Sequence, residues 1–292
     1  MKVLVLHGRS PSANGLELFE KAQELGHDVT LGSILDISSQ VSNAGSRFWL
    51  KSKEISDTDV CFLRSFGPGS CEQTTRRISM IEHMEVAGIR VVNPGYQFRR
   101  ARDKYATQYV LASAGLPVAE TFTTESLNQA YSKAEELGVS VFKPILGSMG
   151  KGILKFDDPD LAFNAFKTLS RIGEPLIVQE YLRNPGRDMR IFVVGDRVVG
   201  TSFKYGAEGN WKTNVAQGGR MVDEPVSDEF KELGLKAVKA MGLDYAGVDI
   251  METDRGPVIL EVNGAPGWQA LKESTGTDIA MEIVKYATSG IE

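Results

Sequence analysis

The chain has 292 residues, of which 42% are hydrophobic and 24% are charged, and its net charge at pH 7 is -5. This length predicts two or three subdomains, and the composition is that of an ordinary globular protein. The acidic balance argues against a broad nucleic-acid interface, and no apolar run is long enough to span a bilayer. We therefore expect a cytoplasmic protein without a nucleic-acid or membrane partner. Cys61 and Cys71 lack metal-ligand spacing, which argues against structural zinc and a disulfide framework.

Residues 1–94 form the first predicted domain, in which strand patterns alternate with helix patterns. Strands are predicted at residues 2–6, 27–31, 59–63 and 90–93, and helices at 16–25 and 78–87. This alternation predicts an α/β domain with a parallel sheet covered on both faces. Ligands of such sheets bind beyond the carboxyl ends of the strands, which is where Arg64 falls. The position of Arg64 suits an arginine that binds a carboxylate or phosphate, but it suits a solvated loop arginine equally well.

Residues 95–182 form the second predicted domain, of α+β type. Helices are predicted at 98–115 and 126–137, and extended segments at 117–122, 141–144, 153–156 and 176–182. A glycine-rich loop joins the second and third of these segments, and its residues are Gly147, Ser148, Met149, Gly150, Lys151 and Gly152. Its glycines allow a tight turn whose N–H groups face phosphate oxygens, although a plain turn also fits. Because the loop opens no helix, it differs from a Walker or Rossmann phosphate loop.

Two polar features of this second domain indicate a nucleotide. Lys143 lies in an apolar strand, where its ammonium group needs an anion to offset the cost of desolvation. Gln179 and Glu180 end the strand at 176–182, and such a hinge can read an adenine edge while apolar neighbours hold the ring. A polar strand end explains this pair equally well.

Residues 183–292 form the third predicted domain, also α+β. Hairpins are predicted at 189–202 and 247–263, and helices at 227–241 and 278–288. Between the first hairpin and its following helix, the segment 203–219 is rich in glycine and carries Lys204, Trp211, Lys212 and Asn214. Such a segment is more typical of an active-site loop than of a linker, and we expect it to close over the reacting substrate.

The hairpin at 247–263 carries a predicted metal site. Side chains alternate faces along a strand, which places Glu261 and Asn263 on one face of the second strand, where Asp249 of the first strand joins them. Oxygen ligands of this kind suit Mg²⁺, whose shell is usually completed by water and substrate phosphates. The alternative is that these polar side chains only cap the solvent ends of the strands.

Taken in order, these elements resemble the ATP-grasp superfamily and, within it, the RimK-like amino-acid ligases. The resemblance covers nearly the whole chain from about Arg99, with a compatible βα domain before it. The matching stretches are Asp103-Lys104, Phe142-Lys-Pro144, the 147–152 loop, Gln179-Glu-Tyr-Leu182, Arg187-Asp-Met-Arg190, Thr213-Asn214, Gly247-Val-Asp249 and Glu261-Val-Asn263. It implies an N-terminal βαβ pre-ATP-grasp domain followed by two α+β lobes that enclose the nucleotide.

The resemblance also implies roles for individual residues. Lys104 and Lys143 would hold the α- and β-phosphates of ATP under the 147–152 loop, and Asp188 would contact the ribose. Adenine would bind at Gln179, Glu180, Tyr181 and Leu182. Two Mg²⁺ ions, with Mn²⁺ as a substitute, would bind at Asp249, Glu261 and Asn263. The catalytic positions would be Arg190, Lys212 and Asn214.

The function implied is that of an ATP-dependent carboxylate–amine ligase, in which an acylphosphate of the acceptor is attacked by the amine of L-glutamate. The chain resembles family members that modify cofactors in methanogenic archaea, which implies a pterin acceptor, tetrahydromethanopterin. The family resemblance also implies a homodimer or homotetramer. Basic residues of the cleft would suit such a polyanion, namely Arg64, Arg99, Arg100 and Arg102, although these could equally be solvated. Alternative acceptors are a deazaflavin coenzyme, a ribosomal protein C-terminus and an amino-group carrier protein. An alternative of a different functional class is a catalytically inactive ATP-grasp domain that only senses nucleotide.

Overall fold

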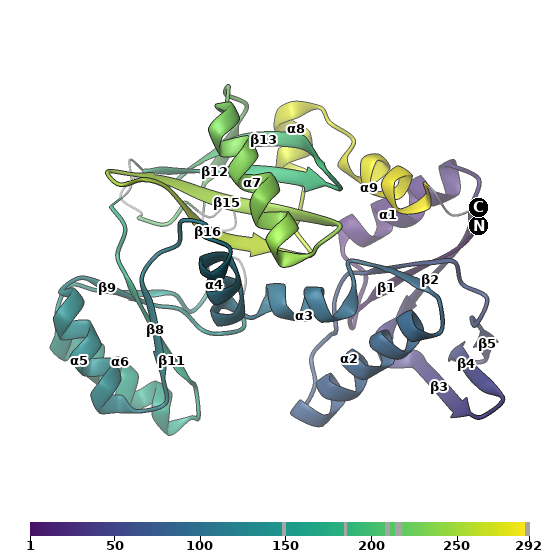
Figure 1. Ribbon diagram of the computed structural model, residues 1–292, viewed down its shortest axis with the longest axis horizontal. Coiled ribbons are helices and arrows are strands. Elements are labelled where there is room, and N and C mark those ends of the chain that lie inside the picture. Colours follow the sequence, from purple (N-terminus) through teal and green to yellow (C-terminus); the bar gives the residue numbers. More distant parts are fainter. Residues whose placement is uncertain (148–149, 184–185, 208–210, 214–217, 290–292) are drawn as a thin grey trace.

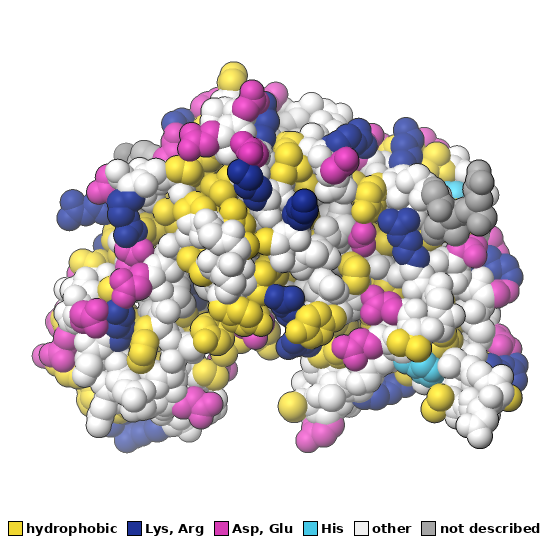
Figure 2. Space-filling model, in the orientation of Figure 1, with side chains coloured by type: hydrophobic (Ala, Val, Ile, Leu, Met, Phe, Trp, Pro, Cys, Tyr) yellow, Lys and Arg dark blue, Asp and Glu magenta, His cyan; other side chains and the backbone are white. Residues whose placement is uncertain are grey.

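The computed structural model describes residues 1–147, 150–183, 186–207, 211–213 and 218–289. Three bodies are visible in Figure 1: an N-terminal domain, a central lobe that carries α5 and α6, and a C-terminal sheet that lies between the two. Figure 2 shows that this face is hollowed between the central lobe and the N-terminal domain, with hydrophobic and basic side chains gathered at the hollow over α3 and α4. Within the described residues, no helix is long and apolar enough to cross a membrane.

The N-terminal domain contains the predicted parallel sheet, with strand order β2-β1-β6-β7. Its elements are β1 (Lys2–His7), α1 (Ala13–Glu24), β2 (Asp28–Ser33), β6 (Val60–Leu63), α2 (Cys71–Val86) and β7 (Arg90–Val92). A second, antiparallel sheet was not predicted; it follows the short 3-10 helix Ile34–Asp36 and consists of β3 (Ile37–Ser42), β4 (Gly45–Leu50) and β5 (Lys53–Glu54). Most of β3 is exposed, so its sequence lacks the apolar alternation that identifies a half-buried strand.

The central lobe is a four-stranded antiparallel sheet of order β10-β9-β11-β8. Its elements are β8 (Thr121–Thr124), α5 (Leu127–Leu137), β9 (Ser140–Phe142), β10 (Leu154–Phe156), α6 (Pro159–Arg171) and β11 (Leu176–Glu180). The helix α6 was not predicted, although Asp158 accepts a hydrogen bond at its start and Pro159 opens its first turn. Phe166 of α6 packs between Phe142 and Phe156 and forms the core of the lobe.

The single helix predicted at 98–115 is two helices, α3 (Gly95–Arg102) and α4 (Lys104–Ser113). The prediction was wrong because Asp103 leaves the helical conformation and accepts a hydrogen bond from Ala106 N at 2.9 Å, which makes it the N-cap of α4. Val110 and Leu111 of α4 pack into the core of the C-terminal sheet. The two helices therefore lie beneath the C-terminal sheet, between the N-terminal domain and the central lobe (Figure 1).

The C-terminal body is a five-stranded antiparallel sheet of order β14-β13-β12-β15-β16. Its elements are β12 (Arg187–Val194), β13 (Arg197–Tyr205), β14 (Arg220–Val222), α7 (Asp228–Met241), β15 (Tyr245–Thr253), β16 (Gly256–Asn263), α8 (Gln269–Thr275) and α9 (Ile279–Thr288). Both predicted hairpins are confirmed. Alternate residues of β12 point to opposite faces: Ile191 packs with α7, and Phe192 packs with α8 and α9.

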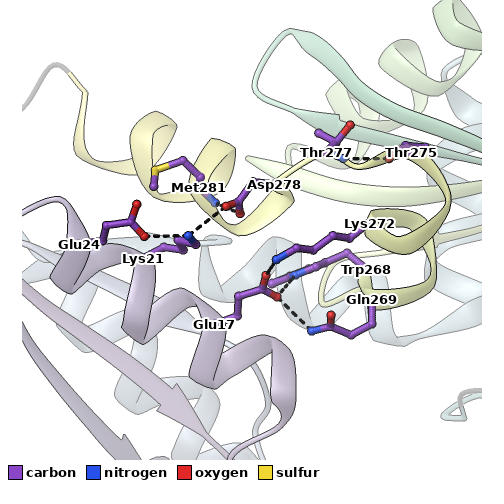
Figure 3. Close-up of polar contacts among 10 residues, drawn as sticks. All are labelled: Glu17, Lys21, Glu24, Trp268, Gln269, Lys272, Thr275, Thr277, Asp278 and Met281. Carbon is purple, nitrogen blue, oxygen red and sulfur yellow. Dashed lines mark hydrogen bonds and ion pairs between the residues drawn. The ribbon is translucent and has the colours of Figure 1, made fainter.

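One core joins the first and last parts of the chain. Val3 and Leu18 of the N-terminal domain share a buried cluster with Trp268 and Ile283 of the C-terminal body. At its edge, the buried Glu17 of α1 accepts hydrogen bonds from Trp268 Nε1 at 2.7 Å and Gln269 Nε2 at 3.0 Å, and it pairs with Lys272 (Figure 3). This contact fixes the N-terminal domain against the segment that follows the predicted metal ligands.

Candidate active site

Two adjoining cavities lie where the N-terminal domain, the central lobe and the C-terminal sheet meet. The larger has a volume of about 450 Å³ and the smaller about 110 Å³. They share Lys104, Lys143, Gln179, Leu260 and Glu261, so they form one continuous cleft. Both predicted phosphate lysines and one predicted metal ligand therefore lie at the junction of the two cavities.

The predicted metal ligands lie on one face of the β15–β16 hairpin. Asp249 pairs in register with Glu261, and Asn263 pairs with Gly247 two residues further along. Glu261 and Asn263 line the larger cavity, and Asp249 lines the smaller one together with Glu261. The alternation of side chains along the strands thus brings together the three positions predicted from the sequence.

Asp249 belongs to a buried charge network. Arg190 donates from Nε to Oδ1 of Asp249 at 2.5 Å and from Nη2 to Oδ2 at 3.0 Å, and Lys204 Nζ lies 2.8 Å from Oδ2. Lys204 also lies 2.7 Å from Oδ1 of Asp188, whose second oxygen accepts a hydrogen bond from Thr213. Burial favours the neutral acid, but Arg190 and Lys204 outweigh it and lower the pKa of Asp249 to about 2. Asp249 is therefore ionised, as a metal ligand must be.

These residues fit a divalent cation that prefers oxygen ligands. A carboxylate offers about four lone-pair directions, and Asp249 uses three of them on Arg190 and Lys204, which leaves one for a metal ion. Glu261 has an open carboxylate at the cavity, and Asn263 presents an amide oxygen that also accepts from Ala265 N at 3.0 Å. In the part of the chain that the structure describes, no group of three or more His, Cys, Asp or Glu gathers as a metal site. The site thus depends on two carboxylates and one amide, which suits Mg²⁺ completed by substrate phosphates.

The two predicted phosphate lysines face Glu261 across the cleft. Lys104 Nζ donates to Gly147 O at 2.8 Å, which attaches α4 to the start of the glycine-rich loop. Burial lowers the pKa of Lys143 to about 8, with Glu261 opposing the shift and the ammonium of Lys104 adding to it. Two crowded ammonium groups facing one carboxylate form a site that favours an anion.

The glycine-rich loop joins the antiparallel strands β9 and β10, as predicted. Gly150 and Gly152 have φ angles of +68° and +75°, a conformation that side chains with a Cβ rarely adopt. Ser148 and Met149, two of the predicted nucleotide-binding residues, lie outside the described residues, and Lys151 is exposed.

The predicted adenine hinge lines the smaller cavity at Gln179, Glu180, Tyr181 and Leu182. Its polar side chains are already engaged. Gln179 donates to Thr121 Oγ1 at 2.7 Å, and Glu180 accepts from Arg255 at 2.7 Å. These contacts hold the hinge in place and occupy the two polar side chains that were predicted to contact a base.

Aromatic and basic side chains close the smaller cavity. The rings of Tyr181 and Trp211 lie 5.9 Å apart, and the ammonium of Lys155 lies 4.4 Å from the Tyr181 ring centroid. Lys212 donates to Ile153 O at 2.8 Å and to Gly150 O at 3.3 Å, which links residues 211–213 to the glycine-rich loop. Asn214, the third predicted catalytic residue, lies outside the described residues.

Two residues differ from their expected settings. Lys204 is not in a loop, because β13 continues to Tyr205 and buries its ammonium between two carboxylates. Arg64 is buried rather than solvated: it donates to Tyr245 Oη at 2.8 Å and Pro266 O at 2.8 Å, it lies 4.8 Å from the Trp268 ring centroid, and it lines the larger cavity. Arg64 thus holds the segment that follows Asn263. Its position at the end of a strand does not reveal these contacts, because they are made to residues far away in the sequence.

A comparison with known families assigns the chain to one of them. Residues 101–287 match the family model described as a RimK-like ATP-grasp domain, which is more than half of the chain. The chain belongs to the RimK-like ATP-grasp family.

Individual relatives agree with this assignment. The chain is 33% identical over 280 residues to the tetrahydromethanopterin:alpha-L-glutamate ligase of Methanosarcina acetivorans, covering 86% of each chain. It is 30% identical over 296 residues to the probable alpha-L-glutamate ligase of Haemophilus influenzae, covering 98% of this chain and 97% of that one. A solved structure of the ATP-grasp ligase PsnB complexed with minimal precursor, Mg and ADP has a TM-score of 0.72 at 20% identity, covering 97% of this chain and 96% of the other. The predictions of an ATP-grasp fold and of a RimK-like ligase are confirmed.

Proposed function

We propose that this RimK-like protein joins the α-amine of L-glutamate to an acceptor carboxylate at the expense of ATP, and that the acceptor is tetrahydromethanopterin. The observation that carries the proposal is the continuous cleft in which Lys104 and Lys143 face Glu261. Such a cleft places phosphates between cationic and metal-binding groups. The choice of glutamate and of the pterin rests on the 33% identity to the Methanosarcina acetivorans ligase.

The nucleotide occupies the smaller cavity and the junction of the two. Adenine lies at the hinge from Gln179 to Leu182, beside the Tyr181 and Trp211 rings. The α- and β-phosphates extend toward Lys104 and Lys143 beneath the glycine-rich loop. Asp188 lines the same cavity, but Lys204 and Thr213 hold its carboxylate. Its contact with a ribose would therefore use the lone pairs that these partners leave.

Two Mg²⁺ ions, or Mn²⁺ in their place, supply charge neutralisation and hold the phosphates when bound. Asp249, Glu261 and Asn263 provide the ligands. Arg190 and Lys204 hold Asp249 in its orientation before any ligand arrives, which is the preorganisation that catalysis by positioning requires.

The reaction needs no protein nucleophile. An acceptor carboxylate oxygen attacks the γ-phosphorus, and the bond from that phosphorus to the β-bridging oxygen breaks, so that ADP leaves with the electron pair. The amine of glutamate then attacks the acyl carbon, phosphate leaves, and the amine nitrogen loses a proton. Cationic side chains near the γ-phosphate lower the barrier by stabilising charge on the transferring group. Lys212, anchored to the glycine-rich loop, is placed to contribute to this stabilisation once the loop covers the phosphates.

The test incubates the protein with ATP, Mg²⁺ and all amino acids against a panel of acceptors, and measures product mass. The expected product is tetrahydromethanopterin with one glutamyl residue added. A product formed only on a deazaflavin coenzyme, a ribosomal protein C-terminus or an amino-group carrier protein would identify that molecule as the acceptor. The proposed ligase activity would then stand, and the proposed pterin acceptor would be wrong. Nucleotide binding without any product would indicate a sensing domain. Size-exclusion chromatography with light scattering tests our accompanying proposal of a homodimer or homotetramer.

A further inference from the structure

The positive charge of the larger cavity extends beyond the junction where the phosphates fit. Its lining includes Arg64, Arg102, Lys104 and Lys143, against the single carboxylate of Glu261. The two lysines lie at the junction with the smaller cavity, where the phosphates fit. The remaining positive charge lies at the opposite end, formed by the N-terminal domain and α3.

Only one of the two arginines at that end is committed to the protein. Arg64 donates hydrogen bonds to the hydroxyl of Tyr245 and to the carbonyls of Ala265 and Pro266. The guanidinium of Arg102, the last residue of α3, makes no hydrogen bond or ion pair within the described parts of the chain, and its central carbon lies 5.5 Å from the Phe66 ring centroid. Burial lowers the pKa of this guanidinium from its ordinary value. A partly desolvated cation with no anionic partner is costly unless a ligand supplies one.

The neighbouring arginines provide an internal contrast. The guanidinium carbons of Arg99 and Arg100 lie 5.2 Å and 5.4 Å from the ring centroid of Tyr96, and neither residue lines the larger or the smaller cavity. Of the two alternatives left open for this basic cluster, a place in the cleft fits Arg102 alone. Helix geometry explains the division, because Phe98, Ala101 and Arg102 are spaced i, i+3 and i+4 along α3 and line the cavity together, whereas Arg99 and Arg100 fall outside this spacing.

We propose that Arg102 binds the carboxylate of the acceptor, at the end of the larger cavity that Ser65 and Phe98 also line. This assignment rests on the proposed ligase function and adds the position of the second substrate. Ser65 Oγ accepts from Gly67 N at 2.9 Å, which leaves its hydroxyl proton to donate to the same anion. The buried Phe98 ring, with Ala101 beside it, offers an apolar wall to the chain that carries the carboxylate. A planar guanidinium matches a carboxylate in two parallel hydrogen bonds, and this geometry aims the acceptor at the phosphate junction.

The test compares Arg102→Gln with Arg99→Gln, which removes the same charge from the same helix outside the cavities. With tetrahydromethanopterin as acceptor, Arg102→Gln should raise the acceptor KM about 10- to 100-fold, the range expected for a lost charge-assisted hydrogen bond. Arg102→Lys should recover part of the loss, and Arg99→Gln should leave the KM unchanged. The affinity of all variants for an ATP analogue should equal that of the wild type. An unchanged acceptor KM in Arg102→Gln, or a loss of nucleotide affinity instead, would overturn the assignment.

A binding measurement separates this assignment from the proposed function. 2-Hydroxyglutarate, a soluble dicarboxylate, is titrated calorimetrically into the protein saturated with Mg²⁺ and ADP. The wild type and Arg99→Gln should both bind the dicarboxylate at least about 10-fold more tightly than Arg102→Gln does. If the dicarboxylate binds in this pattern but no acceptor is ligated, the anion site stands and the ligase proposal fails. If ligation proceeds and all three proteins bind the dicarboxylate equally or not at all, the ligase stands and Arg102 is not its carboxylate site. Thermal unfolding of each variant confirms that it is folded.

Discussion

Lys204 and Asp249 form a buried ion pair across strand β12, with Lys204 Nζ 2.8 Å from Oδ2. The same ammonium lies 2.7 Å from Oδ1 of Asp188, so one cation holds two carboxylates together inside the C-terminal sheet. Burial alone would lower the pKa of Lys204, but Asp249 and Asp188 outweigh it and raise this pKa above its ordinary value. The predicted metal-binding face is therefore held in place by protein contacts alone.

Replacement of Lys204 by Met should destabilise the fold strongly. Removal of one partner leaves Asp188 and Asp249 buried together without a cation, and such losses cost about 3–5 kcal/mol in free energy of unfolding. Urea unfolding without Mg²⁺ measures this. The control is Lys236→Met. Lys236 and its partner Glu232 lie 2.8 Å apart on the exposed face of α7, and the loss of this ion pair should cost less than about 0.5 kcal/mol. Equal stabilities of the two variants would contradict the role assigned to Lys204.

Glu261→Gln should abolish ligation while leaving the fold intact. The amide removes one of two carboxylates from the site, so Mg²⁺-dependent affinity for ATP should fall by about 10-fold or more. Titration of a fluorescent ATP analogue with and without Mg²⁺ measures the effect. The matched control is Asp254→Asn, in the exposed turn of the same hairpin. Full activity in Glu261→Gln would show that this residue is not a metal ligand.

Nucleotide affinity should fall as pH rises through about 8. Burial lowers the pKa of Lys143 to about 8 in the unliganded protein, and bound phosphates should raise it again. Above pH 8 the unliganded lysine is neutral and must take up a proton on binding, so each further pH unit costs up to about tenfold in affinity. Calorimetry in buffers of different ionisation enthalpy should detect this proton uptake. Lys143→Arg keeps its charge and should lose the pH dependence; an identical pH profile would assign the titration to another group.

Glu17→Gln should loosen the N-terminal domain. Glu17 receives hydrogen bonds from Trp268 and Gln269 and pairs with Lys272, and loss of its charge should cost about 1–3 kcal/mol (Figure 3). Burial raises the pKa of Glu17, but Lys272 and Trp268 bring it below the ordinary value. This contribution is therefore present above the unfolded pKa and disappears as pH falls through the folded one. Glu24→Gln on the exposed side of α1 is the control, with a change below about 0.5 kcal/mol. Thermal unfolding at neutral pH compares the two, and equal stabilities would contradict the interface role.

The sequence by itself determined the local elements and the face on which the ligands lie. Period-two alternation along 247–263 predicts that Glu261 and Asn263 share a face, and the hairpin register places Asp249 opposite Glu261. Glycines at 147–152 likewise predict the connection between β9 and β10, because glycine adopts the positive φ angles that Gly150 and Gly152 have in this turn.

Only the tertiary structure decided which charged groups meet. Lys204 and Asp188 are separated by 16 positions in the chain, and their contact depends on the pairing of β12 with β13. Arg64 and Arg102 both lie at the ends of elements and line the larger cavity, yet only Arg64 also donates hydrogen bonds to the carbonyls of residues 265–266. A sequence pattern indicates whether one face of a helix or strand is buried or exposed. The partner of a single side chain depends on long-range packing, which local periodicity does not encode.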